Sequence, residues 1–160
     1  MKGDKNFMTK ADCIKETKQH VVKVATCIDK VIEELMIRRA FHDSSKMQEP
    51  ELAIFTEFTP KLKNSTYGSD EYKGFLKEMG VALQHHYENN PHHPEHFENG
   101  IKGMTLVDIV EMFCDWKAAT LRHDNGDIYK SIEFNKNRFG YSDDLEQIFI
   151  NTAQLFDDVR

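Results

Sequence analysis

The chain has 160 residues, of which 39% are hydrophobic and 30% are charged, and its formal net charge is −6. This length favours one domain, and the 11 Phe, 5 Tyr and single Trp exclude an unfolded, solvated chain because they can build a core. The negative charge argues against a nucleic-acid backbone as the main partner, since such binding requires clustered Lys and Arg.

Cysteine usage and the N-terminus bear on the compartment. Cys13, Cys27 and Cys114 are far apart and form no CxxC pair, which favours an intracellular protein with reduced, mostly buried thiols. The segment MKGDKNFMTK lacks the apolar stretch of a signal peptide. No run approaches the roughly 18 apolar residues of a membrane span. We therefore expect a cytoplasmic location and no membrane contact.

The N-terminal third is predicted to be helical. A helix over Thr9–Arg39 would start with Thr9 as N-cap and Asp12 three residues later, as in a capping box. Its apolar residues recur at spacings of three and four, namely Ile14, Val21, Val24, Ile28, Val31, Ile32 and Leu35. A short helix over Glu51–Phe58 would follow, opened by Pro50 and ended by Pro60.

The rest of the chain also shows helical patterns. Thr105 is the expected N-cap of an apolar helix that runs to Arg122. The other expected helices cover Asp70–Tyr87, Asp127–Arg138 and Asp143–Phe156. No strand-like alternation persists for more than a few residues. The prediction is a single all-α domain over residues 1–160, a compact bundle of about five or six helices.

The stretch HDSSK, residues 42–46, is the strongest local signal for chemistry. Adjacent His42 and Asp43 offer one imidazole nitrogen and one carboxylate oxygen to the same divalent ion. A His-Asp pair occurs often by chance, so its meaning depends on other ligands elsewhere in the chain.

His20 and Asp115 are the candidate ligands on other helices. His20 lies on or beside the apolar stripe of the first helix, and the alternative is a histidine at the core edge bonded to a backbone carbonyl. Asp115 lies within the apolar segment VEMFCDWKAA, where a buried carboxylate is costly unless it is paired or binds a metal. The alternative for Asp115 is a salt bridge to an arginine, such as Arg38, Arg39 or Arg122.

Five of the eight histidines fall between positions 85 and 96, in and before the stretch NNPHHPEHF. The stripe Phe75, Met79, Leu83 continues to His86, whereas His85 is rotated by about 100° from it. Periodicity does not rank His92, His93 and His96. Pro91 and Pro94 restrict the backbone around the first two, which favours His93 and then His92 as ligands. The alternative is a surface histidine patch.

The order of His20, then His42-Asp43, then Asp115 resembles the HD-domain superfamily of metal-dependent phosphohydrolases. That resemblance implies an all-α bundle in which these four residues bind a divalent ion. In several branches the lysine of the HDxxK form, here Lys46, faces the substrate phosphate or the metal-bridging oxygen. Branches with additional histidines between the pair and the last Asp hold two or three metals, as in the HD-GYP type. This chain lacks the GYP tripeptide, so a cyclic-dinucleotide substrate does not carry over.

A closer resemblance covers nearly the whole chain. The strings HDSSKMQEPEL, HYENNPHHPEHF and MTLVDIVEMFCDWKAA are similar to an uncharacterised family of small bacterial and phage proteins. This resemblance implies a bacterial cell or a phage-infected host and adds no substrate.

The expected function is a metal-dependent phosphohydrolase acting on a nucleotide or another small phosphate ester. One or two divalent ions (Mn, Fe, Co, Ni, Zn or Mg) would be held by His20, His42, Asp43, His86, His92, His93 and Asp115. Asp43 would bridge two ions, and Lys46 would neutralise charge on the phosphate. Glu111, together with Glu51 and Glu88, is a candidate for orienting histidine ligands or for acid–base chemistry.

The C-terminal third of the sequence contains candidate substrate contacts, and two rival functions remain open. Arg122, His123, Asn135 and Arg138 are candidates for binding phosphate, with helix capping and surface ion pairs as the alternative. The apolar C-terminal helix could serve either the core or a homodimer face. The rival functions are a di-iron oxygenase of the HD fold and a non-catalytic metal- or nucleotide-binding module.

Overall fold

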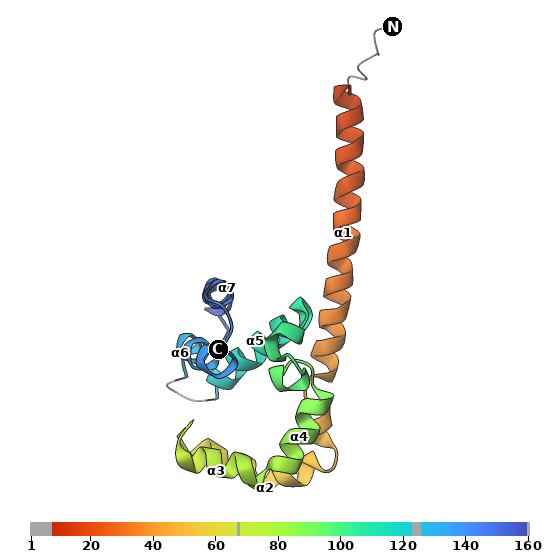
Figure 1. The fold of residues 1–160 in the computed structure, drawn as a ribbon. Coiled ribbons are helices and arrows are strands. Elements are labelled where there is room, and N and C mark those ends of the chain that lie inside the picture. Colours follow the sequence, from red (N-terminus) through yellow and green to blue (C-terminus); the bar gives the residue numbers. More distant parts are fainter. Residues whose placement is uncertain (1–7, 67, 123–125, 160) are drawn as a thin grey trace. The chain divides into compact units, whose positions relative to one another are not determined.

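The computed structural model describes residues 8–66, 68–122 and 126–159, and within these ranges it contains seven α-helices, short 3₁₀ helices and no strand (Figure 1). The prediction of an all-α protein is confirmed, and the expected count of five or six helices was approximate. None of the helices in the described part is both long and apolar enough to span a membrane.

The chain divides into two units, Met1–Ala40 and Phe41–Arg160, each of which is described by itself. The first consists of α1, which runs from Lys10 to Phe41. It begins where predicted, because the Asp12 amide donates to Thr9 Oγ1 and the Thr9 amide donates to Asp12 Oδ2. It ends at Phe41, just before the HDSSK stretch.

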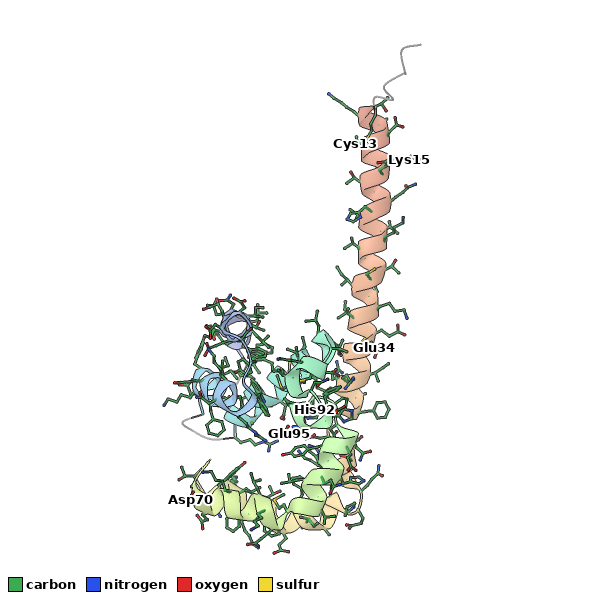
Figure 2. All side chains as sticks on the ribbon, in the orientation of Figure 1. Cys13, Lys15, Glu34, Asp70, His92 and Glu95 are labelled. Atoms are coloured by element: carbon green, nitrogen blue, oxygen red, sulfur yellow. The ribbon has the colours of Figure 1, made fainter. Side chains whose placement is uncertain are left out.

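No residue of α1 is buried, and its side chains project from the helix on all sides (Figure 2). The apolar stripe is therefore exposed, with Val21 at 59% and Ile28 at 54%. The prediction of mostly buried thiols is wrong, since Cys13, Cys27 and Cys114 are free and exposed. Cys13 and Cys27 are exposed because α1 is exposed, and Cys114 lies on the solvent side of its helix.

The second unit opens with η1 (Ser44–Met47) and α2 (Glu51–Asn64). Pro60 was expected to end this helix, but it lies inside α2. Proline removes one N–H donor and disfavours the helix interior. The residues after it still make contacts: Lys61 bonds Glu57 at 2.7 Å and places its ammonium 4.1 Å from the Phe58 ring centroid.

The single helix expected over Asp70–Tyr87 is two helices, α3 (Asp70–Glu78) and α4 (Gly80–Asn89). Met79 separates them with ψ near 3°, far from the helical value of about −42°. Gly80 has a low helix propensity, and Met79 is fully buried at the bend. The bend therefore results from the flexible backbone of Gly80 next to the buried side chain that fixes Met79.

After α4 the chain forms two short 3₁₀ helices, η2 (Pro94–His96) and η3 (Gly100–Gly103), and then α5 (Leu106–Thr120). The predicted Thr105 cap is confirmed. Thr105 and Asp108 form a reciprocal capping box.

The C-terminal part consists of α6 (Ile128–Phe139), α7 (Asp143–Ala153) and η4 (Gln154–Phe156), close to the predicted ranges. Gly140 ends α6 in the left-handed conformation, φ 64°, as is usual for a glycine at this position. These helices pack on α5 around an apolar core made of Met112, Phe113, Ile128, Ile132, Tyr141, Phe149 and Ala153. This core holds α5 in place beside the polar cluster described next.

Candidate metal centre

A cluster of histidines and carboxylates forms where four parts of the second unit meet: the turn into η1, the end of α4, the loop into η2 and the middle of α5. It contains His42, Asp43, His86, His92, His93 and Asp115. Figure 2 labels His92, whose side chain is almost fully buried. Residues up to 73 positions apart thus contribute to one site (42 to 115).

Asp43 lies at the centre of this cluster. Its Oδ1 is 3.5 Å from the Nε2 atoms of both His86 and His92. Its Oδ2 is 3.6 Å from His42 Nε2 and 2.6 Å from Lys46 Nζ. The two oxygens of one carboxylate therefore face different partners, a geometry suited to a ligand shared by two ions.

The backbone of Asp43 is left-handed, with φ 55° and ψ 17°. Among the described residues it is the only non-glycine with a positive φ. Such conformations cost free energy in L-residues other than glycine and occur often at functional sites. The turn directs the carboxylate into the cluster immediately after the end of α1.

Two ligand groups can be distinguished by which Asp43 oxygen they face. The three-histidine group consists of Asp43, His86, His92 and His93, and the two-carboxylate group consists of His42, Asp43 and Asp115. In each group, the candidate donor atoms lie within 4.8 Å of one another. Donor atoms bound to one ion at about 2 Å are separated by such distances.

Two polar atoms in this cluster are buried without a hydrogen-bond partner in the described structure: Asp43 Oδ1 and His92 Nε2. They lie 3.5 Å apart, without hydrogen-bond geometry. Leaving a buried polar atom unpaired costs about 1–3 kcal/mol, and more for a charged group. A cation between these atoms would satisfy both, so the residues present fit a divalent metal.

His86 and His93 face each other through their Nε2 atoms, 2.8 Å apart. A neutral imidazole carries one hydrogen, so one of the two nitrogens must act as acceptor. Both nitrogens also lie in the three-histidine group. This convergence of ring nitrogens at Asp43 Oδ1 is typical of a metal-ligand set.

Glu111, on α5, contacts two of the histidines from behind. Its Oε1 is 2.9 Å from His42 Nδ1 and 3.2 Å from His92 Nδ1. A carboxylate can only accept here, so it favours the tautomer with hydrogen on Nδ1 and leaves Nε2 free. These three residues could themselves hold an ion, but the hydrogen-bond distance favours an orienting role for Glu111.

The two-carboxylate group is strongly charged. Hydrogen bonding to Asp115, then to Glu111, raises the pKa of His42 to about 10 against the opposing effect of burial. Burial acts to raise the pKa of Asp115, but His42, His92 and Lys46 outweigh it and lower the value to about 2. His42 is therefore held as a cation between anions, at a position where a metal ion would replace its proton.

The three-histidine group has the opposite character. Burial, together with the neighbouring His92 and His86, lowers the pKa of His93 to about 3. Burial, followed by the charge of Lys46, also lowers the pKa of His86. Neutral imidazole is the form that binds metals. These histidines are therefore ready to act as ligands at neutral pH.

The other two histidines between positions 85 and 96 bond to groups outside the two ligand groups. His85 is paired with Glu51 at 2.7 Å, and exposed His96 donates its Nδ1 hydrogen to the Tyr87 carbonyl. His20 is exposed on α1, in the other unit, so its role as a ligand stays a prediction. For Asp115, the ion pair found in the described structure goes to His42 at 3.7 Å.

The predicted substrate contacts are not gathered at the cluster. Arg138 pairs with Glu95 at 2.5 Å, and Asn135 is buried in α6, where it bonds Ser131. Arg122 is exposed after the end of α5, and His123 lies outside the described residues. Of the predicted phosphate-binding residues, Lys46 alone lies against the cluster's described ligands.

Sequence reasoning missed three residues that support the cluster: Ser45, His85 and Asn90. The Asn90 amide donates to Ser45 Oγ at 2.7 Å and to the His86 carbonyl at 2.8 Å. Asn90 therefore ties the HDSSK turn to the end of α4. Their positions in the sequence were the available signal, since His85 is next to His86, Asn90 is two positions before His92, and Ser45 lies within the HDSSK motif.

The fold and the site together define a class of protein. It is an all-α protein with a buried cluster of histidines and carboxylates that can hold a metal. The family model DUF5662, described as a family of unknown function, matches residues 9–155, and the chain belongs to this family. No curated protein and no solved structure matches the chain.

Proposed function

We propose that this protein is a divalent-metal-dependent phosphohydrolase that acts on a nucleotide or another small phosphate ester, in the cytoplasm of a bacterium or of an infected host. The observation that carries the proposal is the Asp43 carboxylate. It has a ligand group on each side, and its buried Oδ1 faces the equally unpartnered Nε2 of His92.

The charge of the cluster is suited to one or two divalent ions. Four carboxylates, those of Asp43, Glu51, Glu111 and Asp115, lie in or directly behind it, and Lys46 is the one ammonium paired with its ligands in the described structure. Uncompensated buried negative charge is expensive. With His42 giving up its proton, one divalent cation would leave these groups with a net charge of −1 and two would leave them with +1, so the cluster is close to neutral with either number of ions.

The donor sets suggest different preferences for the two ions. Three imidazoles and one carboxylate suit Zn, Fe, Co, Ni or Mn, whereas one imidazole and two carboxylates make a harder site that also accepts Mg. When bound, such ions polarise a phosphoryl oxygen and lower the pKa of a coordinated water. This is the chemistry that phosphate-ester hydrolysis requires.

Lys46 supplies the positive charge that a phosphate needs. Its ammonium lies 2.6 Å from Asp43 Oδ2, and its side chain remains about one-third exposed at 34%. It can therefore meet an incoming anion without leaving the cluster. Charge stabilisation by such a group contributes to catalysis where negative charge develops in the transition state.

Elemental analysis of protein purified without a histidine tag, followed by a phosphatase and phosphodiesterase panel with Mn, Co, Ni and Mg, tests the proposal. We expect one to two ions per chain and turnover of at least one phosphate ester. Iron together with oxygen uptake would instead indicate an oxygenase. Metal binding without turnover of any substrate would indicate a binding module.

A further inference from the structure

Glu51 is a carboxylate with an unusual location. It is the first residue of α2, and its side chain is fully buried, with 0% of its surface exposed. A buried carboxylate is costly unless hydrogen bonds compensate it. The N-terminal end of a helix favours negative charge and contributes part of this compensation. The rest comes from two histidines.

Each oxygen of Glu51 accepts a hydrogen bond from a different histidine. Oε1 is 2.7 Å from His85 Nδ1, and Oε2 is 2.9 Å from His86 Nδ1. With both oxygens engaged, the carboxylate cannot rotate without losing one of these bonds. His85 thus holds Glu51 in the orientation that Glu51 uses to hold His86.

This arrangement fixes the tautomer of His86. Asn90 Nδ2 also lies 3.0 Å from His86 Nδ1, but its two hydrogens are used by Ser45 Oγ and the His86 carbonyl. Because the Glu51 carboxylate only accepts, His86 carries its hydrogen on Nδ1, which leaves the Nε2 lone pair directed towards Asp43 Oδ1, 3.5 Å away, and His93 Nε2. His86 is itself buried, so its ring has little freedom to turn.

We propose that Glu51, clamped by His85, is the positioning residue for His86 in the three-histidine group, as Glu111 is for His42 and His92. This inference rests on the proposed function only in that a metal binds this group. It assigns no catalytic step to Glu51. Partners behind histidine ligands typically change metal affinity by about 10- to 100-fold when they are removed.

Titration of the full-length, chelator-treated protein with Co²⁺ tests the inference, because the visible spectrum of Co²⁺ reports its ligands. Glu51→Gln keeps the volume but leaves one acceptor oxygen for two N–H donors. We expect Co²⁺ affinity to fall about 10- to 100-fold, with a changed spectrum. His85→Gln should produce a smaller loss in the same direction.

Glu57→Gln is the matched control. Glu57 lies on the same helix, and its exposed carboxylate pairs with Lys61 outside the cluster. This variant should bind Co²⁺ as the wild type does. Wild-type affinity and spectrum in Glu51→Gln would overturn the inference.

Nitrogen-resolved NMR of the wild-type imidazoles gives a second measurement that requires no variant. We expect hydrogen on Nδ1 of both His85 and His86 in the metal-free protein. Hydrogen on His86 Nε2 would overturn the inference, even if Glu51→Gln failed to fold. Co²⁺ binding that depends on Glu51 in a protein without phosphatase activity would reject the proposed function and retain this inference.

Discussion

The second unit has two interiors of opposite chemistry, and α5 contributes to both. Towards α6 and α7, the helix presents Met112 and Phe113 to an aromatic core in which Phe149 stacks on Phe113 with ring centroids 5.5 Å apart. Towards α4 and η2, it presents Glu111 and Asp115 to the histidine cluster.

The difference concerns what each interior needs in order to be stable. The aromatic core is self-sufficient, because burial of apolar surface is favourable without any partner from solution. The histidine cluster contains unpaired buried atoms and excess negative charge, so a bound cation would stabilise it. The same helix therefore packs against an apolar core on one side and, on the other, carries polar groups that a cation would stabilise.

The largest expected effect is on the apolar side. Phe149→Ala removes a ring that is 2% exposed and also packs edge-on against Trp116 and Tyr141, so we expect a loss of about 3–5 kcal/mol in the free energy of unfolding. Urea unfolding measures it. Ile148→Ala, at a neighbouring residue that is 57% exposed, should stay within about 0.5 kcal/mol of wild type. Equal losses in both variants would remove the distinction between core and surface on α7.

Asp43→Asn affects the charged side. Asparagine tolerates the left-handed backbone but lacks the negative charge that both ligand groups share. We expect metal content to fall and kcat/KM on any hydrolysed ester to drop about 100-fold or more. Elemental analysis and the phosphatase assay check this. Full metal content with full activity would show that the cluster is not the site.

Lys46→Met should give a smaller effect, confined to the substrate. We expect kcat/KM to fall about 10- to 100-fold while metal content is retained, because Lys46 contributes charge and is not a ligand. Lys61→Met is the control: like Lys46, Lys61 pairs with a carboxylate and lies over a phenyl ring, but outside the cluster. If both variants lost activity equally, the role of Lys46 at the site would be rejected.

The pH dependence of the metal-free protein is the subtlest expected effect. His93 has a folded pKa of about 3, below its ordinary value of 6.5, so its contribution to stability is present above pH 6.5 and declines as the pH falls towards 3. His42 has a folded pKa of about 10, so its contribution is present below pH 6.5 and declines as the pH rises towards 10.

Urea midpoints between pH 4 and pH 9 measure both declines. His93→Gln should flatten the acid limb of the curve, and His42→Gln should flatten the alkaline limb. His96→Gln, at an exposed histidine outside both ligand groups, should leave the shape unchanged. Curves parallel to wild type in all three variants would contradict the assigned charge states.

Local sequence patterns predicted the helices because a helix cap or a hydrophobic stripe depends on residues that are only a few positions apart. The Thr105–Asp108 box is an example. Periodicity likewise placed His86, and not His85, on the face that reaches Asp43. The bend at Met79 depends on the burial of that side chain, which a local pattern does not contain. The helix α2 continues past Pro60 with contacts inside the same helix, which the prediction of Pro60 as its end did not consider.

The supporting residues of the cluster were harder to predict for the same reason. Glu51 and His86 are 35 positions apart, and Ser45 and Asn90 are 45 apart. Their pairing follows from how α2, α4 and η1 pack. Glu51 and Glu111 were recognised as candidates, but the histidine that each one holds is visible only in three dimensions.

The left-handed backbone of Asp43 also has a consequence for substitutions that would make the protein more stable. Glycine adopts this conformation without steric cost, whereas an L-residue loses roughly 1–2 kcal/mol there. Asp43→Gly would relieve that strain and remove the buried, unpartnered Oδ1, while it would give up the ion pair of Oδ2 with Lys46. A search for thermostable variants would therefore select against the central carboxylate, because at this position the chain gives up stability in order to keep its chemistry.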